Sequence, residues 1–145
     1  MQTVLFLCTG NYYRSRFAEI YFNHHAQQRG LPFVADSRGL ALEPLNPGPM
    51  SRNTVRWLES LAIPIPHNPP FPRSAEVVDF EGAGLIVAVK EAEHRPLMER
   101  KFPEWADRVE YWHIHDVDCA TPDDALPLLE RQVAELLGRL GSASS

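Results

Sequence analysis

The sequence predicts one α/β domain built on a four-stranded parallel sheet with helices on both faces. Short apolar runs that suit buried strands alternate along the chain with segments of helical periodicity. The connections between them are short or rich in proline, and no internal repeat is visible. With 145 residues, of which 44% are hydrophobic, the chain can form one ordinary core.

The expected strands are short runs of apolar and β-branched residues. Residues 4–7 and 85–89 are almost wholly apolar, as strands buried on both faces of a parallel sheet are. Residues 33–37 and 109–112 complete the set of four. Because strands and helices alternate, right-handed crossovers are expected to place all four in one sheet.

The expected helices lie between these strands. The first starts near Phe17 and ends near Arg29 and Gly30. Proline-rich stretches around residues 44–49 and 64–72 must be loops, because proline breaks helices and interior strands. The remaining expected helices are residues 51–61, with Ser51 as N-cap, residues 92–101 and residues 123–140. The domain is predicted to cover residues 1–140, with 141–145 as a disordered tail.

The octapeptide Cys-Thr-Gly-Asn-Tyr-Tyr-Arg-Ser, residues 8–15, joins the first expected strand to the first expected helix. Backbone N–H groups of such a loop converge at the helix N-terminus, where they bind a tetrahedral oxyanion. The same positive end favours the thiolate form of Cys8 at the base of the loop. Arg14 can hold two phosphate oxygens with its planar fork. A thiolate, an amide cradle and a guanidinium together indicate covalent phosphoryl transfer.

Composition argues against several other classes. The net charge of −5 and the lack of a basic run argue against nucleic acid or an anionic membrane as partner. The first apolar stretch is too short for a signal peptide, and no transmembrane segment follows it. The 2 cysteines, Cys8 and Cys119, do not form a disulfide scaffold, so a cytoplasmic location is expected.

Phosphoryl transfer to a thiolate also needs an acid that protonates the leaving oxygen. Residues 112–118 follow the last expected strand, so their loop opens on the same edge of the sheet as Cys8. This segment offers Asp116 and Asp118. His113 and His115 also suggest a metal, but the other histidines fall in unrelated segments. We therefore expect no metal and no cofactor.

Residues 4–19, Val-Leu-Phe-Leu-Cys-Thr-Gly-Asn-Tyr-Tyr-Arg-Ser-Arg-Phe-Ala-Glu, resemble the N-terminal signature of the low-molecular-weight protein tyrosine phosphatase family. Weaker landmarks extend the resemblance over nearly the whole chain. The resemblance implies a flavodoxin-like sheet with strand order 2-1-3-4. It also implies a phosphomonoester hydrolase, in particular a protein tyrosine phosphatase, that works through a phosphocysteine intermediate. Substrates would be phosphotyrosine proteins or small phosphomonoesters, with phosphate as product and inhibitor.

The resemblance also assigns roles to individual residues. It implies Cys8 as nucleophile, Arg14 as phosphate ligand and Asp116 as general acid, with Asp118 as fallback. Within the loop, Asn11 holds the backbone and Ser15 stabilises the thiolate, while Ser37 supports the loop from below. His67 lies where relatives brace the loop asparagine. The implied substrate-binding residues are Thr9, Gly10, Asn11, Tyr12, Tyr13 and Ser15.

The chain departs from the family pattern at several positions. Tyr13 replaces a second cysteine that shields the nucleophile in many relatives, and Arg16 replaces a proline and should add positive charge near the phosphate. Asp118 and Cys119 stand where relatives place aromatic residues that hold a substrate ring, which weakens the expectation of phosphotyrosine. Two alternatives are left open: a thiol-dependent arsenate reductase, and a non-enzymatic binder of phosphate or phosphoproteins.

Overall fold

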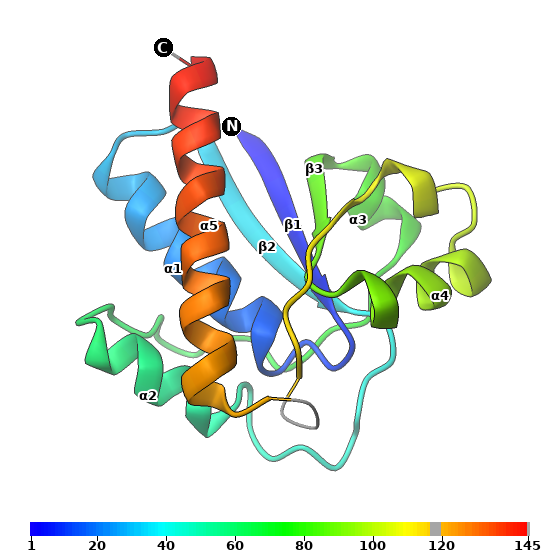
Figure 1. Cartoon of the computed structure of the whole chain (residues 1–145), viewed down its shortest axis with the longest axis horizontal. Helices are drawn as coiled ribbons and strands as arrows, with labels where there is room; N and C mark the ends of the chain where they lie inside the picture. Colours follow the sequence, from blue (N-terminus) through cyan, green and yellow to red (C-terminus); the bar gives the residue numbers. More distant parts are fainter. Residues whose placement is uncertain (117–119, 145) are drawn as a thin grey trace.

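In the computed structural model, described here for residues 1–116 and 120–144, four parallel strands form one sheet. The strands are β1 (Gln2–Cys8), β2 (Phe33–Gly39), β3 (Ala83–Ala88) and β4 (Glu110–Tyr111). Their order is β2-β1-β3-β4, as expected. Figure 1 shows both termini at the end of the sheet opposite the loop that follows β1.

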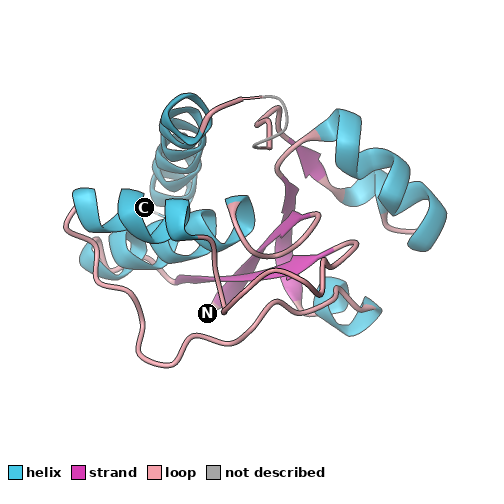
Figure 2. Ribbon diagram, turned by 90° about the horizontal axis from the view of Figure 1, so that it is seen from below, coloured by secondary structure: helices cyan, strands magenta, loops and turns pink. Residues whose placement is uncertain are grey.

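Helices cover both faces of the sheet (Figure 2). Side chains alternate along β1, so Val4 and Phe6 belong to one core cluster and Leu5 and Leu7 to another. This alternation explains why the strand is apolar throughout. The helices are α1 (Arg14–Gln28), α2 (Arg52–Ser60), α3 (Val77–Glu81), α4 (Glu91–Lys101) and α5 (Pro122–Ser144), with a 3₁₀ turn at Ala106–Arg108.

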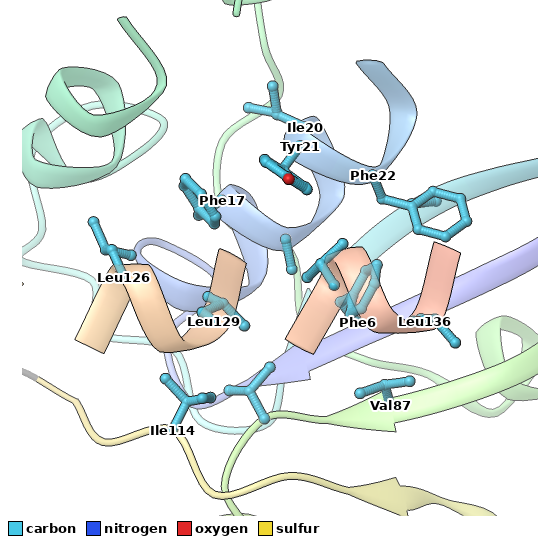
Figure 3. Close-up of a cluster of buried hydrophobic side chains, with 14 of the residues drawn as sticks. Phe6, Phe17, Ile20, Tyr21, Phe22, Val87, Ile114, Leu126, Leu129 and Leu136 are labelled. Atoms are coloured by element: carbon cyan, nitrogen blue, oxygen red, sulfur yellow. The ribbon is translucent and has the colours of Figure 1, made fainter. Parts of the chain in front are cut away.

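The larger core lies between the sheet and helices α1 and α5 (Figure 3). Phe6 of β1 is fully buried, and its ring centroid lies 6.0 Å from that of Phe22 and 5.9 Å from that of Trp112. Leu129 and Leu136 of α5 are buried in the same cluster. This packing fixes the start of α1 relative to the end of β1, and therefore the loop between them.

Most expected elements are present, with shifted ends. Ser51 caps α2 as predicted, because its hydroxyl accepts from the Asn53 backbone N–H at 3.1 Å. The last helix continues to Ser144, past the end expected at Leu140. Helix α3 and the 3₁₀ turn were not predicted. Of the helices in the described part of the chain, none combines the length and apolar character needed to cross a bilayer.

Candidate active site

The loop between β1 and α1 lies at the edge of the sheet formed by the carboxyl ends of the strands, next to the end of β2. Backbone hydrogen bonds from Leu40 N to Cys8 O and from Ala41 N to Thr9 O, both 2.9 Å, tie the loop to the segment after β2. Gly39 permits this close approach, since a Cβ there would lie 2.8 Å from the Thr9 carbonyl oxygen. Asn11 takes a left-handed conformation with φ of 50°, which asparagine tolerates better than most residues.

Cys8 lies at the base of this loop with only 2% of its surface exposed. Its sulfur is 2.9 Å from the Ser15 hydroxyl in the first turn of α1. The first backbone N–H groups of a helix have no partner within it. Cys8 thus lies beside Ser15 at the start of α1, and its thiolate form stays a prediction.

The side chain of Asn11 connects the end of the loop to β2 and to the segment around Arg73. Its Nδ2 donates to the Ser15 hydroxyl at 3.0 Å and to the Ser37 hydroxyl at 2.9 Å, while its Oδ1 accepts from the Arg73 backbone N–H at 2.9 Å. The brace that was expected from His67 is therefore supplied by the main chain of Arg73. His67 itself is exposed.

The guanidinium of Arg14 is 1% exposed and held by the protein at one end. Its Nη1 and Nη2 donate to the two carboxylate oxygens of Glu93 at 3.3 and 2.9 Å, and Nη1 also donates to the Ile114 carbonyl at 2.9 Å. Nη2 lies 3.5 Å from the Asp116 carboxylate. The Nε–H is buried and has no hydrogen-bond partner among the described residues.

Three acidic groups interact with the Arg14 guanidinium. Burial opposes the charge of the guanidinium, but Cys8, Glu93 and Asp116 outweigh it and raise the Arg14 pKa above its ordinary value. Burial likewise opposes the charge of Glu93, but hydrogen bonds from His94, Arg14 and Thr9 hold the pKa of that carboxyl far below its ordinary value. Glu93 is therefore a carboxylate at any pH near neutrality.

His94 completes this cluster behind Thr9. Its Nδ1 accepts from the Lys90 backbone N–H at 3.0 Å, so in the neutral ring the proton is on Nε2, which lies 3.0 Å from the Thr9 hydroxyl. The Thr9 hydroxyl in turn donates to Glu93. His94 is completely buried, and burial lowers its pKa below the ordinary value. The neutral histidine thus connects the start of α4 to the loop.

A pocket of about 340 Å³ opens above Cys8. Its floor and one wall come from the loop, and the Asp116 carboxylate faces it from the segment after β4. The lining also includes the polar residues Glu43 and Asn46, which follow β2, and Asn53 of α2. Tyr12 stands at the wall, where its hydroxyl donates to the Pro47 carbonyl at 2.7 Å.

The structure brings the predicted catalytic residues together. Cys8, Arg14 and Asp116 line the same pocket, as do Thr9, Gly10, Tyr12 and Tyr13 of the predicted substrate-binding set. Asn11 and Ser15 are buried beneath the loop. Asp118 and Cys119 lie outside the described residues.

The side chain of Arg16 lies beneath the loop and not in the pocket. It is 1% exposed, does not line the pocket, and its guanidinium lies beneath the loop, 3.8 Å from Glu19 and 3.2 Å from the Pro70 carbonyl. Cys8 is among the groups whose charge opposes the lowering of the Arg16 pKa by burial, so the expectation that Arg16 adds positive charge near the phosphate site stays a prediction. The residue before Phe17 points inward on α1, so its long side chain reaches the core side of the loop.

The sequence is matched over residues 3–127 by the family described as low molecular weight phosphotyrosine protein phosphatase. The chain belongs to this family. No curated protein matches the sequence closely enough to count as a relative. The family match and the location of the pocket agree with the resemblance noted from the N-terminal segment.

Solved structures share the fold of this phosphatase. A low molecular weight protein tyrosine phosphatase from Streptococcus pyogenes is 19% identical, with a TM-score of 0.80 over 97% of this chain and 93% of that one. A family member from T. tengcongensis is 26% identical, with a TM-score of 0.72 and coverages of 97% and 96%. An arginine phosphatase from Geobacillus stearothermophilus is 20% identical, with a TM-score of 0.79 and coverages of 99% and 95%.

Proposed function

We propose that residues 1–140 form a phosphatase domain that hydrolyses phosphomonoesters through a phosphocysteine intermediate. The observation that carries this proposal is the shared pocket of Cys8, Arg14 and Asp116. Glu93 and Ile114 hold the end of the Arg14 fork, which leaves the Nε edge for phosphate oxygens. The thiolate, the fork and the carboxyl group then surround one phosphoryl position.

In the first step the Cys8 thiolate attacks phosphorus, so the S–P bond forms as the ester P–O bond breaks. Asp116, protonated, gives its proton to the leaving oxygen. Arg14 and the backbone N–H groups of the loop hold the equatorial oxygens, whose charge develops in the transition state. The loop residues that do this are Thr9, Gly10, Asn11, Tyr12, Tyr13 and Ser15.

In the second step water attacks the phosphocysteine. Asp116, now a carboxylate, takes the proton from this water as the new P–O bond forms and the S–P bond breaks. The departing thiolate regains its hydrogen bond with Ser15, whose hydroxyl lies 2.9 Å from the sulfur. Phosphate is the product, and it occupies the same cradle as an inhibitor. The reaction uses no metal or cofactor and suits a cytoplasmic location.

Phosphotyrosine on a protein is the proposed substrate, with Tyr12 as the aromatic wall of the pocket. One observation favours a second candidate, phosphoarginine. Glu43 lines the pocket and Asn46 adds an amide, so the lining offers an ionic contact to a cationic leaving group. An arginine phosphatase with the same fold supports phosphoarginine as the second candidate substrate.

Turnover on matched peptides tests the function. We expect phosphate release from phosphotyrosine or phosphoarginine peptides, a lower rate with phosphoserine, and none with Cys8→Ser. Iodoacetate should label Cys8, and phosphate should protect it. Phosphoester that is bound but never hydrolysed would favour the non-enzymatic binder, and arsenate-dependent thiol oxidation without phosphatase activity would favour the reductase.

A further inference from the structure

The Cys8 sulfur is the end of a chain of side-chain hydrogen bonds that crosses beneath the loop. It runs from Cys8 to Ser15, from Ser15 to Asn11, from Asn11 to Ser37, and from Ser37 to Glu19. The first four of these residues are each exposed by 2% or less. Because water does not reach these side chains, their donors and acceptors must form hydrogen bonds with one another, and each hydroxyl or amide proton has a single acceptor.

The main chain fixes the direction of this network. The Arg73 N–H can only donate, so the amide oxygen of Asn11 must face it. The amide nitrogen of Asn11 therefore faces both serines and uses one N–H on each, at 3.0 Å for Ser15 and 2.9 Å for Ser37. Each serine oxygen thus already accepts one hydrogen bond from Asn11.

Each serine hydroxyl has a single proton left to donate. Ser37 gives its proton to the Glu19 carboxylate, which can only accept while ionised. Ser15 gives its own to the Cys8 sulfur, 2.9 Å away, when Cys8 is a thiolate, because a thiolate can only accept. If Glu19 were protonated and donated a hydrogen bond, Ser37 would accept hydrogen bonds from both Glu19 and Asn11. The two donors would compete for the Ser37 oxygen, which would weaken the hold on the Asn11 amide that orients Ser15.

Arg16 is the cation next to Glu19. Its Nε lies 3.8 Å from the Glu19 carboxylate oxygen that accepts from Ser37, and both residues project from the first turns of α1. Burial raises the pKa of Glu19 above its ordinary value and Asp36 adds to this rise, which Arg16, Ser37 and Arg73 reduce but do not cancel. A buried carboxylate needs such a partner.

We infer that Glu19, paired with Arg16, is a positioning residue for the Cys8 nucleophile. As an ionised acceptor at the far end of the network, it turns Ser37, Asn11 and Ser15 so that the Ser15 hydroxyl donates to the sulfur. The inference rests on the proposed function in that it takes Cys8 as the reacting group. It adds a residue that neither lines the pocket nor touches the substrate.

A double-mutant cycle on Glu19→Gln and Ser37→Ala tests this, with the Cys8 iodoacetate alkylation rate measured across pH as the readout. We expect each single variant to slow alkylation near neutral pH by about tenfold, the scale of one charge-assisted hydrogen bond. The pH at half-maximal rate should rise in both. The double variant should resemble the singles, because both break the same path. Glu110→Gln, which removes a carboxylate paired with Arg139 far from the loop, is the matched control.

Alkylation measures the reactivity of the thiol without turnover. A failure of the proposed function can therefore be told apart from a failure of the role proposed for Glu19. An unreactive Cys8 in the unaltered protein would remove the proposed function itself. A reactive Cys8 whose pH profile is the same in Glu19→Gln would overturn the role of Glu19, even if thermal unfolding shows that the variant is less stable. Additive effects of the two substitutions would overturn it as well, since Glu19 would then act by a route other than Ser37.

Discussion

Arg14 divides its guanidinium between the protein and the pocket. Glu93 and Ile114 take the end of the fork, and the Nε edge is left without a partner among the described residues. A planar cation that is clamped at one end keeps its orientation when substrate is absent. The loss of side-chain entropy that phosphate binding would otherwise require is thereby avoided.

Glu93→Gln is expected to lower kcat/KM by about ten- to a hundredfold, because the neutral amide cannot clamp the fork through two carboxylate oxygens. The effect should fall mainly on kcat, since the transition state uses the fork best. Glu91→Gln on the same helix is the matched control, because Glu91 pairs with Arg95 near the surface. Higher activity in Glu93→Gln would mean instead that Glu93 competes with phosphate for Arg14.

Asp116→Asn should slow an alkyl or phenyl phosphate by about a hundredfold or more, the upper range for acid catalysis. With dinitrophenyl phosphate the loss should be much smaller, since that leaving group departs without a proton. Steady-state rates on a series of leaving groups measure this dependence. Asp118→Asn is the comparison variant, and if it alone shows the dependence, the acid is Asp118.

At the residue level, the sequence revealed the groups whose local pattern is diagnostic. Cys8 and Arg14 were found from one loop between a strand and a helix. Glu93 and His94 were missed, although they follow β3 and therefore lie at the same edge of the sheet. A charged residue in a helix usually faces solvent, so Glu19 gave no signal, and Arg16 was noted only as the residue that replaces a proline. The packing of α1 against β2 places both side chains beneath the loop.

At the scale of elements, the residues that begin α2 also hydrogen-bond to the loop between β1 and α1. Ser51 caps the helix through its hydroxyl, and its backbone N–H donates to the Tyr12 carbonyl at 2.7 Å. Thr54, in the first turn, donates to the Tyr13 carbonyl at 2.9 Å. The start of α2 is thus hydrogen-bonded to the two residues that precede Arg14.

Ser51→Ala should lower the free energy of unfolding by about 1 kcal/mol, the usual cost of losing a side-chain N-cap. Ser51→Gly should cost only a few tenths of a kcal/mol, because glycine tolerates the cap conformation and lets water reach the free N–H. Urea unfolding of the three proteins provides the comparison. Equal losses for the two variants would show that Ser51 acts by packing rather than by capping.

The order of the elements was easier to predict than their ends. Strands β1 and β3 were recognised because burial on both faces requires continuous apolar runs. Helix α3 was missed because a helix of 5 residues after a proline-rich loop has no room for a periodic pattern. The strand order came from the family resemblance, since alternation of strands and helices fits several orders.

At the scale of the whole molecule, buried ionisable groups make stability depend on pH. His94 is completely buried and neutral, and its Nδ1 is occupied by the Lys90 N–H. Burial lowers its pKa in the folded state, whereas in the unfolded chain it titrates near 6.5. The unfolded state therefore binds more protons as the pH falls below that value, so folding stability falls with it.

We expect the free energy of unfolding to be constant above about pH 7.5 and to decline from there toward pH 5.5, with a slope of at most about 1.4 kcal/mol per pH unit from His94. His94→Asn keeps an acceptor for Lys90 and should flatten this slope, although the smaller side chain lowers stability at every pH.

His25, whose pKa burial also lowers, leaves a residual slope. Glu93 does not interfere, because its pKa is depressed and its contribution is lost only at more acidic pH. Urea unfolding at several pH values, with the exposed His67→Asn as control, measures the slopes, and an unchanged slope in His94→Asn would show that the buried ring is not the group that titrates.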